Sequence, residues 1–398
     1  MRTAVRFAAL VLLTLASAAG ARAQTPYAGT RLSPDATASV WTVRPGTEVY
    51  SRFGHTAIRI RDAGTGLDVL YNYGTFRFDE WFVFRFAYGA MDYELSAAPA
   101  MAALDGYDAL EDRAVVEQTL NLAPARVQAL FDALETNLRP ENATYRYDFL
   151  FDNCATRPRD VLARVLGADV VWPAARPSGS TFRELIALYA RDAPGLRLAM
   201  DMGIGAPVDR AASFRDATFL PDTLLAYLDR ARLRAPDGRL VPLVASTRTL
   251  ASKPPRPAPE AFDWPLALAW GLLLWVAGLT LRDARNGRVR RRARLDRVIF
   301  ALAGGEGLVL AFLVFVSVHR VTAPNAMLLW ASPLHLLLLS VRTTAALRRY
   351  AALAAVLALA GAALVGLGLL GGPAAAVPLA VVVALRAVVR AWPVGART

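Results

Sequence analysis

The chain has 398 residues, enough for two domains of ordinary size, and 55% of its residues are hydrophobic. Its formal net charge is +12, carried almost entirely by arginine. The densest arginine cluster lies between two apolar segments, and no basic run is interleaved with aromatic residues. The composition therefore argues against a nucleic-acid-binding protein and favours a membrane protein.

The N-terminus has the layout of a secretory signal peptide. Two arginines precede a short apolar stretch at 7–19, which is too short to cross a bilayer comfortably. The triplet Ala21-Arg22-Ala23 then matches the small-x-small pattern of a cleavage site. We expect residues 1–23 to be removed on export, so that the following domain is periplasmic or extracellular.

Arginine-rich and arginine-poor loops alternate between apolar segments in the C-terminal third. Because cytoplasmic loops carry the positive charge, the pattern places the preceding domain outside the inner membrane and the C-terminus in the cytoplasm. Glu306 lies within the second segment, either beside a glycine-rich packing patch or on a substrate path. We predict five membrane-spanning helices, at 264–281, 298–318, 326–341, 350–371 and 374–390.

A proline-rich segment separates the two parts of the chain. Prolines at this density favour a stiff, extended backbone, which would hold the preceding domain close to the membrane. The predicted regions are a signal peptide at 1–23, a periplasmic or extracellular catalytic domain at 24–250, a linker at 251–263 and a transmembrane helical domain at 264–398.

The exported domain mixes strand and helix patterns, which predicts an α+β fold ahead of the all-α bundle. A Gly- and Asp-rich turn at 62–68 lies between two segments of strand character, so that a hairpin is expected. Gly167 is positioned to end a helix. Strands are predicted at 37–44, 54–61, 69–73 and 113–122, a strand or short helix at 81–88, and helices at 125–138 and from about 152 to 166.

Two residues of the exported domain could carry covalent chemistry. His55 is its only histidine, and Cys154 is the only cysteine in the chain. A thiol nucleophile needs a base, which is usually histidine, and a helix N-terminus favours the thiolate and offers N–H groups to an oxyanion. Cys154 lies where a helix is predicted to begin. This pair is therefore a candidate nucleophile and base.

The structural alternative for each residue remains open at this stage. A lone cysteine is more often a small buried residue, and a lone histidine is more often structural. The segment 152–160 is nevertheless too polar for a core cysteine. Asn72, on the strand expected to pair with that of His55, could orient the imidazole, or it could belong to ordinary sheet packing.

Three arginines lie close to these candidates in the sequence. Forked guanidinium groups bind phosphate or carboxylate, so Arg52, Arg157 and Arg159 are candidate substrate-binding residues. Equally, they could form structural ion pairs with Asp152 and Asp160. The sequence shows no metal-ligand cluster and no phosphate-binding loop, and we predict no cofactor.

Long motifs in the chain resemble the Lnb-type family of bacterial membrane proteins. The resemblance extends over most of residues 30–340 and includes the Phe219-Leu220-Pro221-Asp222 stretch. Its strongest parts are Ser51-Arg52-Phe53-Gly54-His55-Thr56, Tyr71-Asn72-Tyr73-Gly74-Thr75-Phe76, Asn137-Leu-Arg-Pro-Glu141-Asn142 and the run from Tyr147 through Asp152-Asn153-Cys154 to Asp160.

The resemblance implies a lipoprotein intramolecular transacylase. Such an enzyme moves an acyl chain from the diacylglyceryl group of a lipoprotein to the α-amino group of its N-terminal cysteine. The His-then-Cys order also resembles circularly permuted papain-like thiol acyltransferases, such as the lecithin:retinol acyltransferase group. His55 then matches the base and Cys154 the nucleophile that carries the thioester. The partners implied are diacylated lipoproteins and membrane lipid.

The same resemblance extends the set of candidate substrate-binding residues. Tyr73 and Asn153 belong to the two motifs that carry the catalytic candidates, whereas His319, Asn325 and Trp330 lie in a family motif at the outer face of the membrane. Two other functions remain open: a cell-envelope cysteine peptidase or amidase that uses the same dyad, and a non-enzymatic membrane scaffold.

Overall fold

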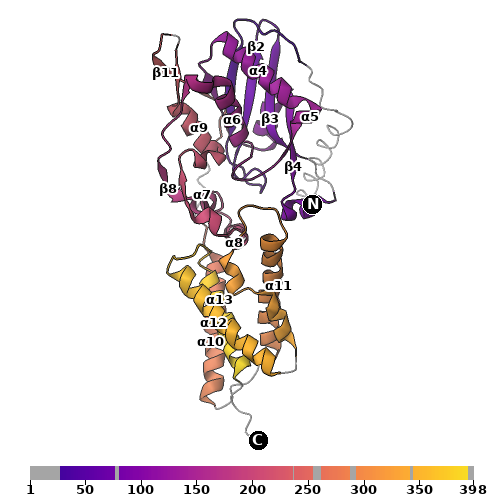
Figure 1. Ribbon diagram of the computed structural model, residues 1–398, viewed down its shortest axis with the longest axis vertical. Helices are drawn as coiled ribbons and strands as arrows, with labels where there is room; N and C mark the ends of the chain where they lie inside the picture. Colours follow the sequence, from indigo (N-terminus) through magenta and orange to yellow (C-terminus); the bar gives the residue numbers. More distant parts are fainter. Residues whose placement is uncertain are drawn as a thin grey trace. The chain divides into compact units, whose positions relative to one another are not determined.

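The computed structural model describes residues 27–76, 80–235, 237–253, 261–286, 293–340 and 344–392 (Figure 1). The predicted signal peptide and most of the proline-rich linker lie outside these residues. The chain forms two compact units, each described here by itself. The sheet unit comprises the residues up to Phe82, Met91–Arg176 and Ser213–Pro254, and the helix unit comprises Val83–Ala90, Pro177–Ala212 and the residues from Pro255 onward.

A seven-stranded antiparallel sheet forms the centre of the sheet unit, in the order β12-β5-β1-β2-β3-β4-β6. The four predicted strands are present, and the predicted hairpin is formed by β2 and β3. The strands are β1 (Thr37–Val43), β2 (His55–Asp62), β3 (Leu67–Thr75), β4 (Asp92–Pro99), β5 (Val115–Leu120), β6 (Thr144–Arg146) and β12 (Val244–Ala251).

Helices cover both faces of this sheet, which explains why β1 is buried on both sides. On one face, Val40 and Ile58 pack with apolar residues of α4 (Pro124–Leu138) and α6 (Thr156–Leu166), seen over the sheet in Figure 1. On the other face, Trp41 packs near α3 (Ala100–Asp105) and the short π-helix Gly106–Leu110. Both predicted helices are confirmed, and Gly167 ends α6 with a positive φ of 55°.

A buried carboxylate ties four strands of the sheet together. Glu117 on β5 accepts hydrogen bonds from Ser39, Trp41, Arg59 and Arg248 at 2.6 to 3.1 Å. Burial by itself would raise the pKa of Glu117, but these bonds favour the charged form and hold the pKa at about 2. The last strand, β12, is therefore fixed to the first part of the sheet through its Arg248 side chain.

Smaller elements complete the sheet unit. A three-stranded sheet has the order β11-β10-β7, and α9 packs against the 3₁₀ turn that precedes it. These elements are α5 (Pro140–Ala143), the 3₁₀ turns Gly167–Asp169 and Asp216–Phe219, β7 (Val170–Val171), α9 (Pro221–Arg230), β10 (Arg232–Arg234) and β11 (Leu240–Pro242).

The helix unit contains three helices in the described residues that are long and apolar enough to cross a bilayer: α10 (Trp264–Arg285), α11 (Ala293–Phe315) and α12 (Ala345–Gly366). A fourth, α13 (Ala376–Ala391), has only 16 residues and packs against α10 and α12. Alanines along the buried side of α12, such as Ala351 and Ala358, allow close helix packing, which is how helices associate in lipid.

The predicted count of five spans is not confirmed. The third predicted span, 326–341, is not a continuous helix but two 3₁₀ segments, Ala326–Leu329 and Pro333–Leu339. Pro333 lacks an N–H group and begins the second segment. This irregular backbone packs tightly on α11, where a Cβ on Gly307 would lie 2.5 Å from Pro333. Non-helical backbone at membrane depth is tolerated when protein covers it in this way.

Two segments that precede the linker in sequence belong to the helix unit. The first contains α2 (Phe82–Tyr88), and the second contains α7 (Phe182–Leu188), α8 (Pro194–Gly203) and the 3₁₀ turn Ala206–Asp209. Strand β8 (Pro177–Thr181) pairs with β9 (Ala211–Ser213), and α8 contacts α10 and α11. The two units are thus interleaved in sequence.

Candidate functional site

A short hydrogen bond joins the two strands of the central hairpin. His55 begins β2 and Asn72 lies on β3, with the imidazole Nε2 2.6 Å from the Asn72 Oδ1 atom. A carbonyl oxygen can only accept a hydrogen bond, so Nε2 carries the proton in the neutral ring. The lone pair of Nδ1 is then left for another partner, which is the tautomer required of a base.

Gly74 marks the point around which the three candidate catalytic side chains gather. A Cβ at this position would lie 3.3 Å from Cε1 of His55, 3.5 Å from Cβ of Cys154 and 4.0 Å from Oδ1 of Asn72. Gly74 has a φ of 129°, which favours glycine. The absence of a side chain at this position therefore lets the imidazole and the cysteine approach each other.

The backbone around the cysteine is held by Asn153. Its side-chain amide donates to the carbonyl oxygens of Phe149 and Phe219, and its oxygen accepts from the N–H groups of Ala155 and Thr156, where α6 begins. These bonds occupy both ends of a side chain that is 3% exposed. Asn153 thus holds the backbone on both sides of Cys154 in the turn that precedes α6, and substrate binding by it stays a prediction.

Burial has the largest effect on the pKa values of both Cys154 and His55. It raises the pKa of the Cys154 thiol to about 11, although the backbone N–H of Thr56, the Arg113 charge and the backbone N–H of Cys154 itself all favour the thiolate. Burial and then Arg113 lower the pKa of His55 to about 4, against the opposing effect of the Asn72 bond. The lowered thiol pKa expected at a helix start is therefore wrong, because desolvation outweighs the amides.

The resting pair is accordingly a neutral thiol beside a neutral imidazole. A half-buried neutral pair can act by general-base catalysis, with the proton leaving sulfur as the new bond forms. The N–H groups of Thr56 and Cys154 favour negative charge at the sulfur. The arrangement can therefore support attack on a carbonyl carbon.

Arg113 and Tyr107 are neighbours of the site that the sequence did not reveal. Arg113 is 4% exposed, donates from Nε to the Arg44 carbonyl oxygen and pairs with Glu111 at 2.6 Å. The Tyr107 ring lies 6.3 Å from the His55 ring, centroid to centroid. Neither residue belongs to a recognisable motif, since the fold alone brings the segment before β5 to the hairpin.

The predicted arginines have partners within the protein. Arg157 forms a bidentate ion pair with Asp152 at 2.6 and 2.8 Å, and its guanidinium lies 3.6 Å from the centre of the Tyr145 ring. Arg159 pairs with Asp160 in the same bidentate manner. For these two, the structure provides the structural partners that the sequence left as the alternative, and substrate binding by them stays a prediction.

Two further candidates of the sheet unit are also buried. The Tyr73 hydroxyl accepts a hydrogen bond from Asn137 at 2.7 Å, and only 1% of the residue is exposed. Arg52 is 8% exposed and donates to the Thr47 carbonyl oxygen. Tyr73 thus joins β3 to α4, and substrate binding by both residues stays a prediction.

The remaining candidates, His319, Asn325 and Trp330, belong to the helix unit. Asn325 donates to the Met202 carbonyl oxygen and accepts from the Met327 N–H, so it joins α8 to the first 3₁₀ segment. Trp330 is 5% exposed and lies in the apolar core. His319 contacts the Phe86 carbonyl oxygen through Nε2 at 2.9 Å.

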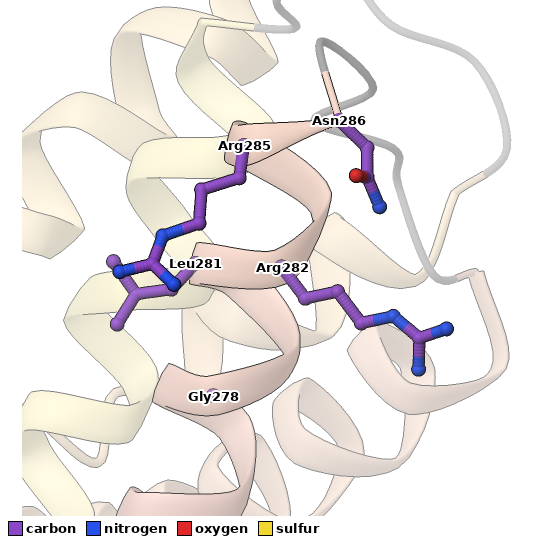
Figure 2. A pocket seen from close by; sticks show the side chains of 5 residues that line it. All are labelled: Gly278, Leu281, Arg282, Arg285 and Asn286. Carbon is purple, nitrogen blue, oxygen red and sulfur yellow. The ribbon is translucent and has the colours of Figure 1, made fainter.

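A surface hollow lies at the C-terminal end of α10, lined by Gly278, Leu281, Arg282, Arg285 and Asn286 (Figure 2). The Arg282 and Arg285 side chains extend to different sides of the helix. The hollow contains none of the predicted site residues. Among the described residues, no group of three or more His, Cys, Asp or Glu could hold a metal ion.

Comparison with known families separates the chain into two matched regions. Residues 24–185 match the model of the Lnb N-terminal periplasmic domain, and residues 258–395 match that of the Lnb transmembrane domain. No curated protein and no solved structure matches the chain. The first match contains His55, Asn72 and Cys154, and the second contains all the helices long and apolar enough to cross a bilayer in the described residues.

Proposed function

This chain is a member of the Lnb family, and we propose that it is a membrane-bound transacylase that acts through a Cys154 thioester. It would move an acyl chain from the diacylglyceryl group of a lipoprotein to the α-amino group of the N-terminal cysteine. The observation that carries this proposal is the convergence of His55, Asn72 and Cys154 on Gly74, with Nδ1 of the imidazole left unprotonated by the Asn72 contact.

The first half-reaction forms the thioester. The Cys154 sulfur attacks the ester carbonyl carbon of the lipoprotein glyceride while Nδ1 of His55 takes the thiol proton. The N–H groups of Thr56 and Cys154 stabilise the oxyanion of the tetrahedral intermediate. The C–O bond then breaks, the imidazolium returns the proton to the departing glyceride oxygen, and a free hydroxyl remains on the lipid.

The second half-reaction uses the amine of the same lipoprotein. The neutral α-amino group attacks the thioester carbonyl, His55 accepts one of its protons, and the C–S bond breaks. The proton passes to the sulfur, which regenerates the neutral thiol and leaves an amide on the N-terminal cysteine. No oxidant, metal or activated acyl donor is needed, because an ester is exchanged for a more stable amide.

The helix unit supports a lipid substrate over a soluble one. Extracting an acyl chain from the bilayer costs roughly 0.8 kcal/mol for each exposed CH₂ group, so a soluble enzyme would face a large barrier to binding. A chain with membrane-spanning helices can meet its substrate without extracting it. The alternative, a cell-envelope cysteine peptidase or amidase, uses the same dyad but gives no reason for the family's transmembrane domain.

Mass spectrometry of lipoprotein N-termini tests the proposal. Cells carrying the wild-type chain should contain N-acylated lyso-form lipoproteins, whereas Cys154→Ser and His55→Ala should leave the diacylglyceryl form with a free amine. Leu240→Ala, at a site 52% exposed on β11, is the matched control and should behave as wild type. Identical acyl forms in all four strains would refute transacylation, and peptide cleavage that depends on Cys154 would favour the peptidase.

A further inference from the structure

Helix α2 exposes aromatic side chains although it interrupts the sequence of the sheet unit. It lies in the chain between β3, which carries Asn72, and β4. Phe84 and Phe86 are each 57% exposed, and Trp81, just before the helix, is 61% exposed. Aromatic side chains of this size usually bury most of their surface in a protein core. Their exposure together on one short helix therefore calls for an environment outside the protein.

The backbone of α2 is fixed to the end of a membrane-spanning helix. Val318, three residues after α11 ends at Phe315, donates its N–H to the Tyr88 carbonyl oxygen at 2.8 Å. His319 contacts the Phe86 carbonyl oxygen at 2.9 Å, and its ring packs edge-on against the Phe86 ring. The depth of α2 relative to the membrane is thus set by where α11 leaves it.

Gly89 makes this close junction possible. It has a φ of 83°, and a Cβ there would lie 3.1 Å from both the ring and the backbone of His319. The chain consequently turns directly after α2 and lies against the loop that follows α11. Such a junction joins two segments more than 200 residues apart, which indicates that the position of α2 is a specific feature of the helix unit.

Other exposed apolar residues continue the surface at the same helix end. Phe315 and Val316, at the end of α11, are 76% and 53% exposed. Trp264, at the start of α10, is 49% exposed. Aromatic residues concentrate where membrane-spanning helices meet water, because their rings suit the boundary between lipid tails and headgroups. The contacts of Val318 and His319 with Tyr88 and Phe86 attach α2 to the α11 end of this boundary.

We propose that α2 is an interfacial element that inserts Phe84 and Phe86 into the headgroup and upper acyl region of the outer leaflet. With one charged residue, Arg85, among seven, it has the apolar character of a helix that lies in a membrane surface. The occupant of the aromatic surface is lipid. This proposal does not depend on the acyl-transfer chemistry, since it concerns only where α2 lies.

Depth measurement on the full chain in proteoliposomes tests this inference. Cys154→Ala gives a cysteine-free background, because Cys154 is the only cysteine. Phe84→Cys, Leu302→Cys and Val49→Cys are then introduced separately and labelled with a nitroxide. Leu302, within α11, and Val49, in the sheet unit, are 70% and 67% exposed and serve as lipid-facing and water-facing controls. Collisions with oxygen and with a water-soluble nickel chelate report the depth of each label.

We expect the Phe84 label to favour oxygen over the nickel chelate, at a depth between those of the other two labels. A Phe84 label as accessible to the chelate as the Val49 label would overturn the proposal. Phe86→Cys provides a second position if the first variant does not fold, and the same two outcomes apply to it.

Discussion

The Nε2 atom of His55 lies 2.6 Å from Oδ1 of Asn72, and this contact fixes which imidazole nitrogen is free to act as a base. Because the amide oxygen accepts but carries no charge, it orients the ring without strongly stabilising the imidazolium. Burial and the nearby Arg113 charge then determine the pKa of His55, which is lowered to about 4. Orientation and ionisation of the ring are therefore controlled by different neighbours.

Replacing Asn72 should affect turnover more than substrate binding. Asn72→Ala removes the acceptor that holds the imidazole but keeps the base itself, and we expect kcat to fall about 10- to 100-fold, which is at or below the lower end of the usual contribution of a positioned base. Asn72→Asp keeps an acceptor and adds a negative charge, which should raise the pKa of His55 and move the acidic limb of the activity profile upward. Initial rates against pH with a diacylated lipopeptide measure both effects.

A matched variant makes this comparison specific. Asn121→Ala also removes an asparagine side chain, one that donates to the Pro242 carbonyl oxygen at the exposed end of β5. This variant should leave the pH profile of activity unchanged. If Asn72→Ala and Asn121→Ala lowered activity by the same factor, Asn72 would have only a structural role.

The pH dependence follows from the shifted pKa values. His55, with its pKa lowered from 6.5 to about 4, is neutral and able to accept a proton above that pH, so thioester formation should persist at pH 5.5 and fall only toward pH 4, whereas transfer to the α-amino group, whose ordinary pKa is about 8, should slow below that pH. The raised pKa of Cys154 implies that its alkylation rate increases about tenfold per pH unit between pH 6 and 9. A plateau in alkylation rate below pH 7 would instead reveal a preformed thiolate–imidazolium pair.

Alanine substitutions at two glycines of the same hairpin distinguish the effect of backbone strain from the effect of crowding at the site. Gly74→Ala introduces a Cβ 3.3 Å from His55 and 3.5 Å from Cys154, and we expect at least a 100-fold loss of activity. Gly66→Ala, in the turn, also has a positive φ, of 73°, but no atom lies within 4 Å of the new Cβ. It should cost about 1 kcal/mol of stability and preserve activity. Equal activity of the two variants would place the reacting groups elsewhere.

A buried ion pair in the helix unit should be sensitive to the loss of one partner. Arg386 on α13 is 1% exposed and pairs with Asp296 on α11 at 2.7 Å, while also donating to the Thr280 hydroxyl on α10. Arg386→Leu should lower the free energy of unfolding by about 3–5 kcal/mol, since it leaves the buried Asp296 carboxylate without its charged partner. Adding Asp296→Leu should restore much of the loss, which thermal unfolding in detergent can measure. A double variant less stable than the single one would contradict this account.

The strands and helices of the sheet unit were predictable because each depends on local pattern. Alternation along 54–61 and 69–73 indicated β2 and β3, and that pairing alone placed Asn72 within reach of His55. The start of α6 after Asn153 was similarly indicated by its sequence. The thiol pKa could not be predicted correctly, because desolvation of Cys154 depends on residues from several distant segments.

The helix unit was less predictable for related reasons. Hydropathy locates apolar segments but does not distinguish a spanning helix from 3₁₀ turns packed on a neighbouring helix, as happens at 326–339. The aromatic segment at 81–88 was predicted as either a strand or a short helix, and it forms the helix α2. Its attachment to the loop after α11 depends on Gly89 and His319, which are distant in sequence. Arg113 was missed because its partners are set by the fold.

The interleaving of the two units constrains the order in which the protein can mature. Residues 83–90 and 177–212 leave the translocation machinery before α10 and α11 are synthesised. Their apolar surfaces are therefore exposed for a time, because the helices that they later contact do not yet exist. A secreted fragment that ended at the linker would keep those surfaces exposed permanently, and its tendency to aggregate would reflect this unfinished assembly rather than a weak sheet.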